Sequence, residues 1–156
     1  THKIIALQQP VAQDLRMLFA VLHVSIDLER IADHAVSIGT IALRNQDHDE
    51  ESQTVKGYLA RMAQVAEKMI ADALDSYITR DAKKARKVAL MDEEIDELLE
   101  AVYRDTAERM ERKLELIPAG IDYLGVAGSL ERIGDYVTNI CERVVFLNTG
   151  EIVELN

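Results

Sequence analysis

The sequence contains few of the residues that interrupt helices or cross-link a chain. Its 156 residues include two prolines, seven glycines and one cysteine, and tryptophan is absent. Long stretches without proline or glycine favour helices. A single cysteine excludes a disulfide bond within the chain, which suits a reducing cytoplasm. No apolar run approaches the roughly 18 residues of a membrane-spanning helix, so we expect a cytoplasmic protein without membrane insertion.

The net charge limits which partners the protein can bind, and the apolar composition limits which residues can form its core. The formal net charge is −10, and aromatic residues make up 4% of the chain. Because an acidic protein is repelled by phosphate backbones, we expect no nucleic-acid partner. Hydrophobic residues make up 48%, and a chain of this length can bury a sizeable core. With so few aromatics, that core must consist of Leu, Ile, Val, Met and Ala, as in helical bundles.

Apolar residues recur at helical spacing and predict four long helices. The expected helices cover residues 11–45, 55–79, 82–114 and 118–148, and the first and last are apolar on nearly all sides, as central helices are. We expect Pro10 to end an earlier helical piece, and since residues 1–9 begin without an N-cap, we expect that upstream sequence is missing. Asp81 is a candidate N-cap, Pro118 suits a first helical turn, and Gly150 suits the position just past a helix.

One short pattern, Leu-Glu-Arg-Ile-x-Asp, occurs twice. It occupies residues 28–33 and 130–135, each time within an apolar helix, and the two copies are 102 residues apart. A period of this length predicts two three-helix units. We expect residues 1–48 to form the C-terminal part of the first unit and residues 49–156 to form the complete second unit.

Each copy of the pattern carries two carboxylates one helical turn apart. Glu131 and Asp135 share one face of a helix, where like charges are destabilising and where burial without a partner costs far more. Asp92 and Asp96 repeat this spacing on the preceding helix. If the two helices pack side by side, the four carboxylates converge on a cation.

The chemistry of this set indicates which cations suit it. All four groups offer oxygen, which matches Mg²⁺, Mn²⁺, Ca²⁺ or iron, whereas zinc is less natural. No histidine follows a glutamate by three residues, so a ferritin-like di-iron oxidase is not expected. The alternative is that Arg30 and Arg132, or lysines on a neighbouring helix, neutralise the acids, or that the acids are simply solvated. Cys141 lies on an apolar helix face and is expected in the core.

The residues around both copies resemble the PhoU family. The resemblance rests on "ALQQPVAQDLRMLFAVLHVSIDLERIADHAVSIG" (6–39), "MDEEIDELL" (91–99) and "LERIGDYVTNICERVVFLNTGEIVEL" (130–155). It implies an all-α fold of tandem three-helix bundles, the first of which is incomplete in this chain. It also implies metal ions (Mg, Mn, Fe or Zn) bound by acidic pairs, and it adds Glu29 and Asp33 to the predicted ligands. Ala32 departs from the pattern, where the second copy has Gly134.

The resemblance further implies a role. Proteins of this family are not enzymes; they link the phosphate-specific ABC transporter, through its ATPase subunit, to a sensor histidine kinase and keep the phosphate-starvation response off. They are usually oligomers, and the incomplete first bundle predicts a dimer. Two alternatives from other classes are a metalloenzyme that acts on a phosphate compound and a purely structural helical module with solvated acids.

Overall fold

The computed structural model describes residues 2–150 and 152–155, and it describes residues 2–7 and 9 by their backbone alone. These residues form five α-helices, and no strand is found among them. The helices are α1 (His2–Arg44), α2 (Ser52–Thr79), α3 (Ala82–Leu90), α4 (Asp92–Arg112) and α5 (Ile117–Thr149), with a 3-10 turn at Leu114–Leu116. The predicted all-α fold is confirmed. No helix in the described part of the chain is long and apolar enough to cross a membrane.

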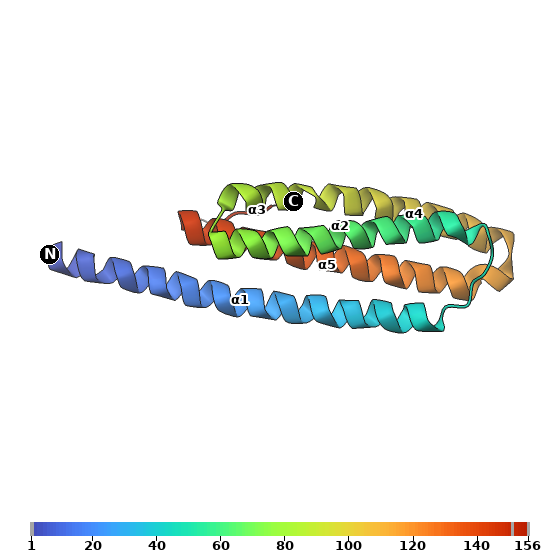
Figure 1. Cartoon of the computed structure of the whole chain (residues 1–156), viewed down its shortest axis with the longest axis horizontal. Coiled ribbons are helices and arrows are strands. Elements are labelled where there is room, and N and C mark those ends of the chain that lie inside the picture. The colour runs from blue at the N-terminus through green and yellow to red at the C-terminus, as the bar shows by residue number, and fades with distance from the viewer. Residues whose placement is uncertain (1, 151, 156) are drawn as a thin grey trace.

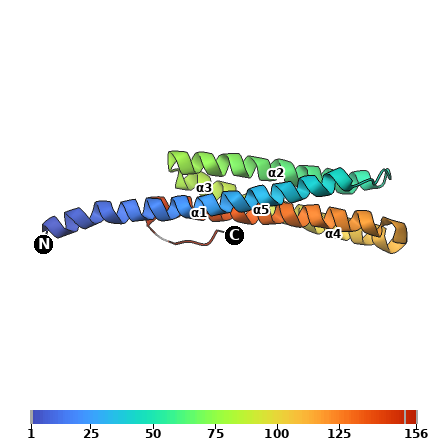
Figure 2. The ribbon, with the colours of Figure 1, turned by 90° about the horizontal axis from the view of Figure 1, so that it is seen from below.

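Helix α5 lies at the centre of the arrangement. It packs against α1 on one side and against α2, α3 and α4 on the other. Figures 1 and 2 show α1 running antiparallel to α5, with the N-terminal part of α1 extending beyond the other helices. Over the described residues, α1 packs closely on α5 and on no other helix. The division of the chain at residues 48 and 49 stays a prediction.

The core is aliphatic, as the composition predicts. It is built around α5, and α2 contributes the fully buried methionines Met62 and Met69. The largest fully buried side chains include Met62, Met69, Ile95, Val102, Val137, Ile140 and Val144. Cys141 is fully buried among them, which confirms its expected place in the core. Burial raises the pKa of its thiol to about 12, which disfavours the reactive thiolate form.

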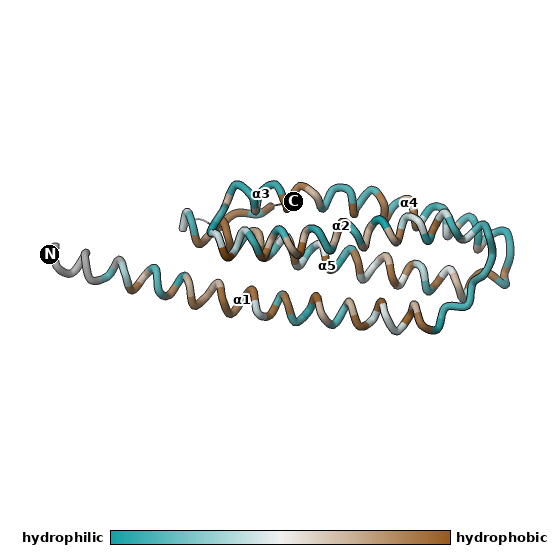
Figure 3. Tube along the Cα trace, viewed as in Figure 1, coloured by the Kyte–Doolittle hydropathy of each residue, from teal (hydrophilic) through white to brown (hydrophobic). Residues whose placement is uncertain are grey.

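Helix α1 buries one narrow stripe and exposes a second apolar face. Ala20, Val24 and Ile31 are buried at helical spacing against α5. On the other sides of the helix, Leu15 is 61% exposed and Leu22 is 55% exposed. Figure 3 shows that hydrophobic residues follow α1 over most of its length. This is the pattern of a central helix whose second face is uncovered in the described structure.

Two sequence-based helix boundaries are wrong. Pro10 lies inside α1 and does not end a helix. Proline removes one backbone hydrogen bond at a cost of about 3 kcal/mol, and Pro10 is exposed on the surface of α1. The helix expected over 82–114 is broken at Met91 into α3 and α4. Charge favours this break, because Lys87 lies in the last turn of α3 whereas Asp92 lies in the first turn of α4.

The local signals at other helix ends are confirmed. The Asp81 carboxylate accepts a hydrogen bond from the Lys84 backbone N–H at 2.9 Å, as an N-cap does. Pro118 lies in the first turn of α5, and Gly150 ends that helix with a φ of 72°. That left-handed conformation suits glycine, which has no Cβ to strain it.

Candidate functional site

The packing of α4 on α5 brings the second repeat's acidic residues into one another's electrostatic range. The pKa of Asp92 is raised from 3.8 to about 7, first by burial and then by the charges of Asp96, Asp135 and Glu131. The pKa of Asp96 is likewise raised, first by burial and then by Asp135. Burial raises the pKa of Glu131, followed by the charge of Asp135 and a hydrogen bond with it. The four carboxylates therefore influence one another's charge, and their convergence on a metal ion stays a prediction.

Asp92 is the most constrained member of this acidic cluster, which comprises Asp92, Asp96, Glu131 and Asp135. Its side chain lies in the first turn of α4 and is only 4% exposed. Its Oδ1 atom is buried and accepts no hydrogen bond. A buried carboxylate oxygen without a partner costs about 1–3 kcal/mol or more. This oxygen lies against α5 at Gly134 and has no hydrogen-bond partner among the described residues.

The neighbouring arginines contact Tyr136, and only Arg132 partly offsets the charge of the acidic cluster. The Arg132 guanidinium donates a hydrogen bond to the Tyr136 hydroxyl at 3.0 Å and lies over its ring. Arg30 lies over the same ring, 5.7 Å from its centroid. Within the described residues, neither arginine forms an ion pair with the cluster, and Arg132 is the last of the groups that act on the pKa of Glu131.

Gly134 makes room for the buried carboxylate. It lies on α5 between Ile133 and Asp135, and a Cβ atom there would overlap Asp92 Oδ1 and lie 3.3 Å from Cδ1 of Ile95. The missing side chain lets α4 bring its first turn close to α5. The corresponding residue of the first copy is Ala32, which is exposed on α1.

The predicted ligands of the first copy lie in a different environment. Glu29 and Asp33 are both exposed on α1, and the described part of the structure sets no carboxylate like Asp92 beside them. In the part of the chain that the structure describes, no three His, Cys, Asp or Glu side chains form a group that could hold a metal ion. A cation in the second copy would therefore have to draw the four side chains closer together.

Comparison with known proteins places this geometry in a family. The PhoU domain matches residues 1–42 and 59–144. The chain is 38% identical to a phosphate-specific transport system accessory protein PhoU homolog of Streptococcus pneumoniae, over 99% of this chain and 70% of that protein. The chain belongs to the PhoU family. A second homolog with the same description, from Caulobacter vibrioides, is 40% identical over 96% of this chain and 64% of that protein.

Solved PhoU structures share the fold. The crystal structure of the phosphate transport system regulatory protein PhoU from Streptococcus pneumoniae has a TM-score of 0.80 and 37% identity, over 92% of this chain and 67% of that one. PhoU from Pseudomonas aeruginosa has a TM-score of 0.81 and 29% identity, over 96% of this chain and 71% of that one. The resemblance that the doubled pattern carries is thereby confirmed.

Two polar features of this PhoU chain escaped the sequence analysis. Asp27 is 7% exposed between α1 and α5. Burial raises its pKa, while a hydrogen bond from Asn139 and the charge of Arg143 lower it. Asn139 therefore faces α1, although it follows Asp135 by four residues on the same helix. The only available signal was the position of Asp27 directly before the repeated pattern.

The second feature is a network that fixes the loop between α1 and α2. The Asp47 carboxylate accepts hydrogen bonds from the Tyr123 hydroxyl at 2.6 Å and from Arg109 at 3.2 Å. Burial alone would raise the pKa of Asp47, but these bonds and one from the Asp49 backbone N–H lower it. Because the partners are 62 and 76 residues away in sequence, local pattern reading could not join them.

The first prediction concerns Gly134. Alanine normally stabilises a helix by about 1 kcal/mol relative to glycine, and Gly128 on the same helix has open space where a Cβ would lie. Gly128→Ala should therefore raise the free energy of unfolding by up to about 1 kcal/mol. Gly134→Ala should lose that gain, because its Cβ must displace the Asp92 carboxylate. Urea denaturation of both variants tests this, and equal gains would contradict it.

The second prediction concerns pH. The pKa of Asp92 is raised from 3.8 to about 7, so the folded state holds this proton more tightly than the unfolded state. The free energy of unfolding should fall as pH rises between these two values, by at most about 1.4 kcal/mol per pH unit, and then level off. Asp92→Asn removes this group. Chelator-treated wild type should therefore show a steeper fall than Asp92→Asn in urea denaturation, and parallel profiles would refute the assignment.

Proposed function

We propose that this chain is a non-catalytic accessory protein of phosphate transport that binds metal ions through its acidic cluster. Membership in the PhoU family, with relatives named as phosphate-specific transport system accessory proteins, supports the accessory role. In this role the chain lies on the cytoplasmic side and negatively regulates phosphate uptake and phosphate-starvation signalling. It does so by linking the ATPase subunit of the phosphate ABC transporter to a sensor histidine kinase.

A buried thiol and the contacts of two arginines support an adaptor over an enzyme. The buried thiol of Cys141 has a pKa of about 12 and is unsuited to nucleophilic chemistry. The acidic cluster has no basic clamp for an anionic substrate, because Arg132 and Arg30 are engaged with Tyr136. Long helices that pack around one central helix instead offer extended surfaces for protein partners.

The single observation that supports metal binding is the buried Oδ1 atom of Asp92, which lacks a hydrogen-bond partner beside three other carboxylates. Burial and then their mutual repulsion raise the pKa of Asp92, Asp96 and Glu131. A divalent or trivalent cation would remove this repulsion and satisfy the orphaned oxygen. Hard cations suit an all-oxygen set, so Mg²⁺, Mn²⁺ and iron are favoured over Zn²⁺.

The third prediction tests this site by metal content. After loading with Mn²⁺ or iron and desalting, wild-type protein should retain metal in mass spectrometry. The double variant Glu131→Ala, Asp135→Ala should retain much less, because it removes both α5 ligands of the acidic cluster. Glu108→Ala, Glu111→Ala is the matched control, since both residues are exposed acids on α4. Equal metal content in all three proteins, or none in any, would refute the site and favour a solvated acidic surface.

The fourth prediction concerns assembly. The uncovered face of α1 carries large apolar side chains, including Leu15, Leu18 and Leu22, each more than half exposed. Exposure of such a face is costly, and association of two copies would remove part of it from water. We expect a dimer by light scattering at micromolar concentration. A monomer at that concentration would contradict the homo-oligomer.

A further inference from the structure

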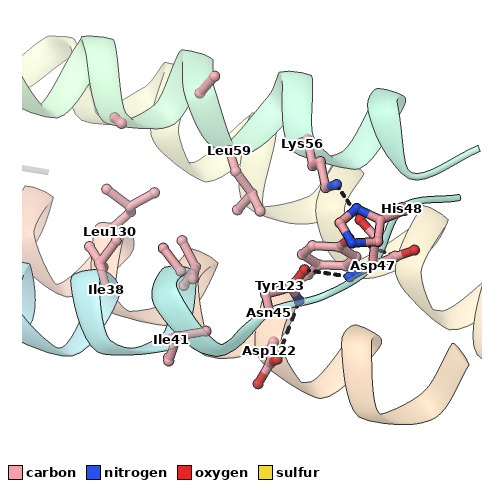
Figure 4. A pocket seen from close by; sticks show the side chains of 14 residues that line it. Ile38, Ile41, Asn45, Asp47, His48, Lys56, Leu59, Asp122, Tyr123 and Leu130 are labelled. Carbon is pink, nitrogen blue, oxygen red and sulfur yellow. Dashed lines mark hydrogen bonds between the residues drawn. The ribbon is translucent and has the colours of Figure 1, made fainter. Parts of the chain in front are cut away.

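A cavity separates α1 from α2 near the loop that joins them. The two helices both pack on α5 but not on each other, and a space of about 400 Å³ remains between them. Figure 4 shows α1 and α2 as opposite walls with α5 behind them. None of the predicted metal ligands lines this cavity. Its size is that of a site for a small organic molecule.

The walls of the cavity are apolar over most of their length. Each of the three helices contributes side chains at steps of three or four residues. The apolar lining consists of Ile38, Ile41 and Ala42 from α1, Leu59, Ala60 and Ala63 from α2, and Val126 and Leu130 from α5. Figure 4 shows Leu59, Ile38 and Leu130 pointing into the space between the helices. Such walls suit an apolar chain or ring and offer it no hydrogen bond.

Polar groups gather at one end of the cavity, and their acceptors are already used. Asp122 accepts hydrogen bonds from Arg44 at 2.8 Å and from the Asn45 side chain at 3.2 Å. The Asp47 carboxylate takes the Tyr123 hydroxyl and Arg109. Each of the two lining carboxylates is thus paired with an arginine. A ligand that arrives with hydrogen-bond donors would find no free carboxylate.

At the same end of the cavity, some hydrogen-bond donors remain unused. The Lys56 ammonium donates to the Asp47 backbone carbonyl at 2.6 Å, and an ammonium group has three protons to donate. Among the described residues, Lys56 forms no ion pair with a carboxylate. The His48 imidazole lies at the same end of the cavity. The head of a ligand must therefore be an acceptor, and an anionic head would use the charge of Lys56 as well.

The loop that carries this polar end is held in place before any ligand binds. The Asp47 and Asp49 backbone N–H groups donate to the side chains of Asn45 and Asp47, at 3.2 and 3.0 Å. Arg109 is 4% exposed and anchors Asp47 from α4. A site whose polar groups are already ordered loses less entropy on binding.

We propose that this cavity binds a small amphipathic anion. The apolar part of the ligand lies between α1 and α2 against α5, and its carboxylate or phosphate head accepts hydrogen bonds from Lys56. The proposal concerns residues outside the acidic cluster, so it stands apart from metal binding. A free amphiphile suits the cavity better than a partner helix, because the donors lie at one end alone.

The absence of tryptophan from the chain allows a direct test. Ala60→Trp places a single fluorophore on the α2 wall, and Ala42→Trp places one on the α1 wall in case the first substitution fills the cavity. Ala71→Trp is the matched control, since Ala71 is exposed on α2 and does not line the cavity. Each full-length variant is titrated with ω-bromododecanoate, whose bromine quenches tryptophan fluorescence at short range.

Saturable quenching is expected at one or both cavity positions and not at Ala71→Trp. In either cavity reporter, Lys56→Gln should weaken the apparent affinity about tenfold, as the loss of one charge-assisted hydrogen bond would. Lys56→Arg should preserve most of the affinity, and Lys87→Gln should leave it unchanged. The corresponding bromoalcohol should bind more weakly than the acid.

Several outcomes would overturn the proposal. Equal quenching at all three tryptophan positions would mean that the apolar face of α1 adsorbs amphiphiles without a defined site. If Lys56→Gln leaves the binding unchanged, Lys56 does not bind an anionic head. The lack of saturable quenching at both cavity positions would leave the space to a partner protein or to no ligand.

Discussion

The structure depends on the requirement that α5 be covered on nearly every side. It packs against α1, α2, α3 and α4, and its residues Val137, Ile140 and Val144 are completely buried. Burial of apolar surface is the largest favourable term in folding, so the positions of the other helices follow from the need to cover this one. A polar residue on α5 is then favoured where it reaches solvent or finds a partner on a neighbouring element.

The need to cover α5 explains where the polar contacts and the acidic cluster lie. Asn139 finds Asp27 on α1, and Tyr123 finds Asp47 in the loop before α2. Glu131 and Asp135 lie where α4 brings further carboxylates, and burial, Asp135 and then Asp96 of α4 raise the pKa of Glu131. Asp47 and Asp92 illustrate the contrast, because hydrogen bonds lower the pKa of the first whereas burial and like charges raise that of the second.

The sequence contained the local and periodic features of this structure, and it lacked most of the long-range ones. Asp81 and Gly150 act through their own backbone neighbourhood, so their types alone identified helix ends. The repeated pattern located the acidic cluster because helical spacing is fixed by geometry. The cavity between α1 and α2 depends on how far apart two helices stand on α5, which no single-helix pattern records. The apolar spacing continues through Met91 without interruption. The break there depends instead on the charges of the residues on either side of it.

The two copies of the repeated pattern show why a sequence motif is not yet a site. Ile31 and Ile133 are both buried, so each copy of the pattern contributes its isoleucine to the core. Gly134 is buried beneath the first turn of α4, whereas Ala32 is exposed. The second copy gains its buried carboxylate from Asp92, which belongs to another helix and can approach because residue 134 has no side chain. The pattern supplies two acids, and the covering helix decides whether they become part of a charged, partly buried cluster.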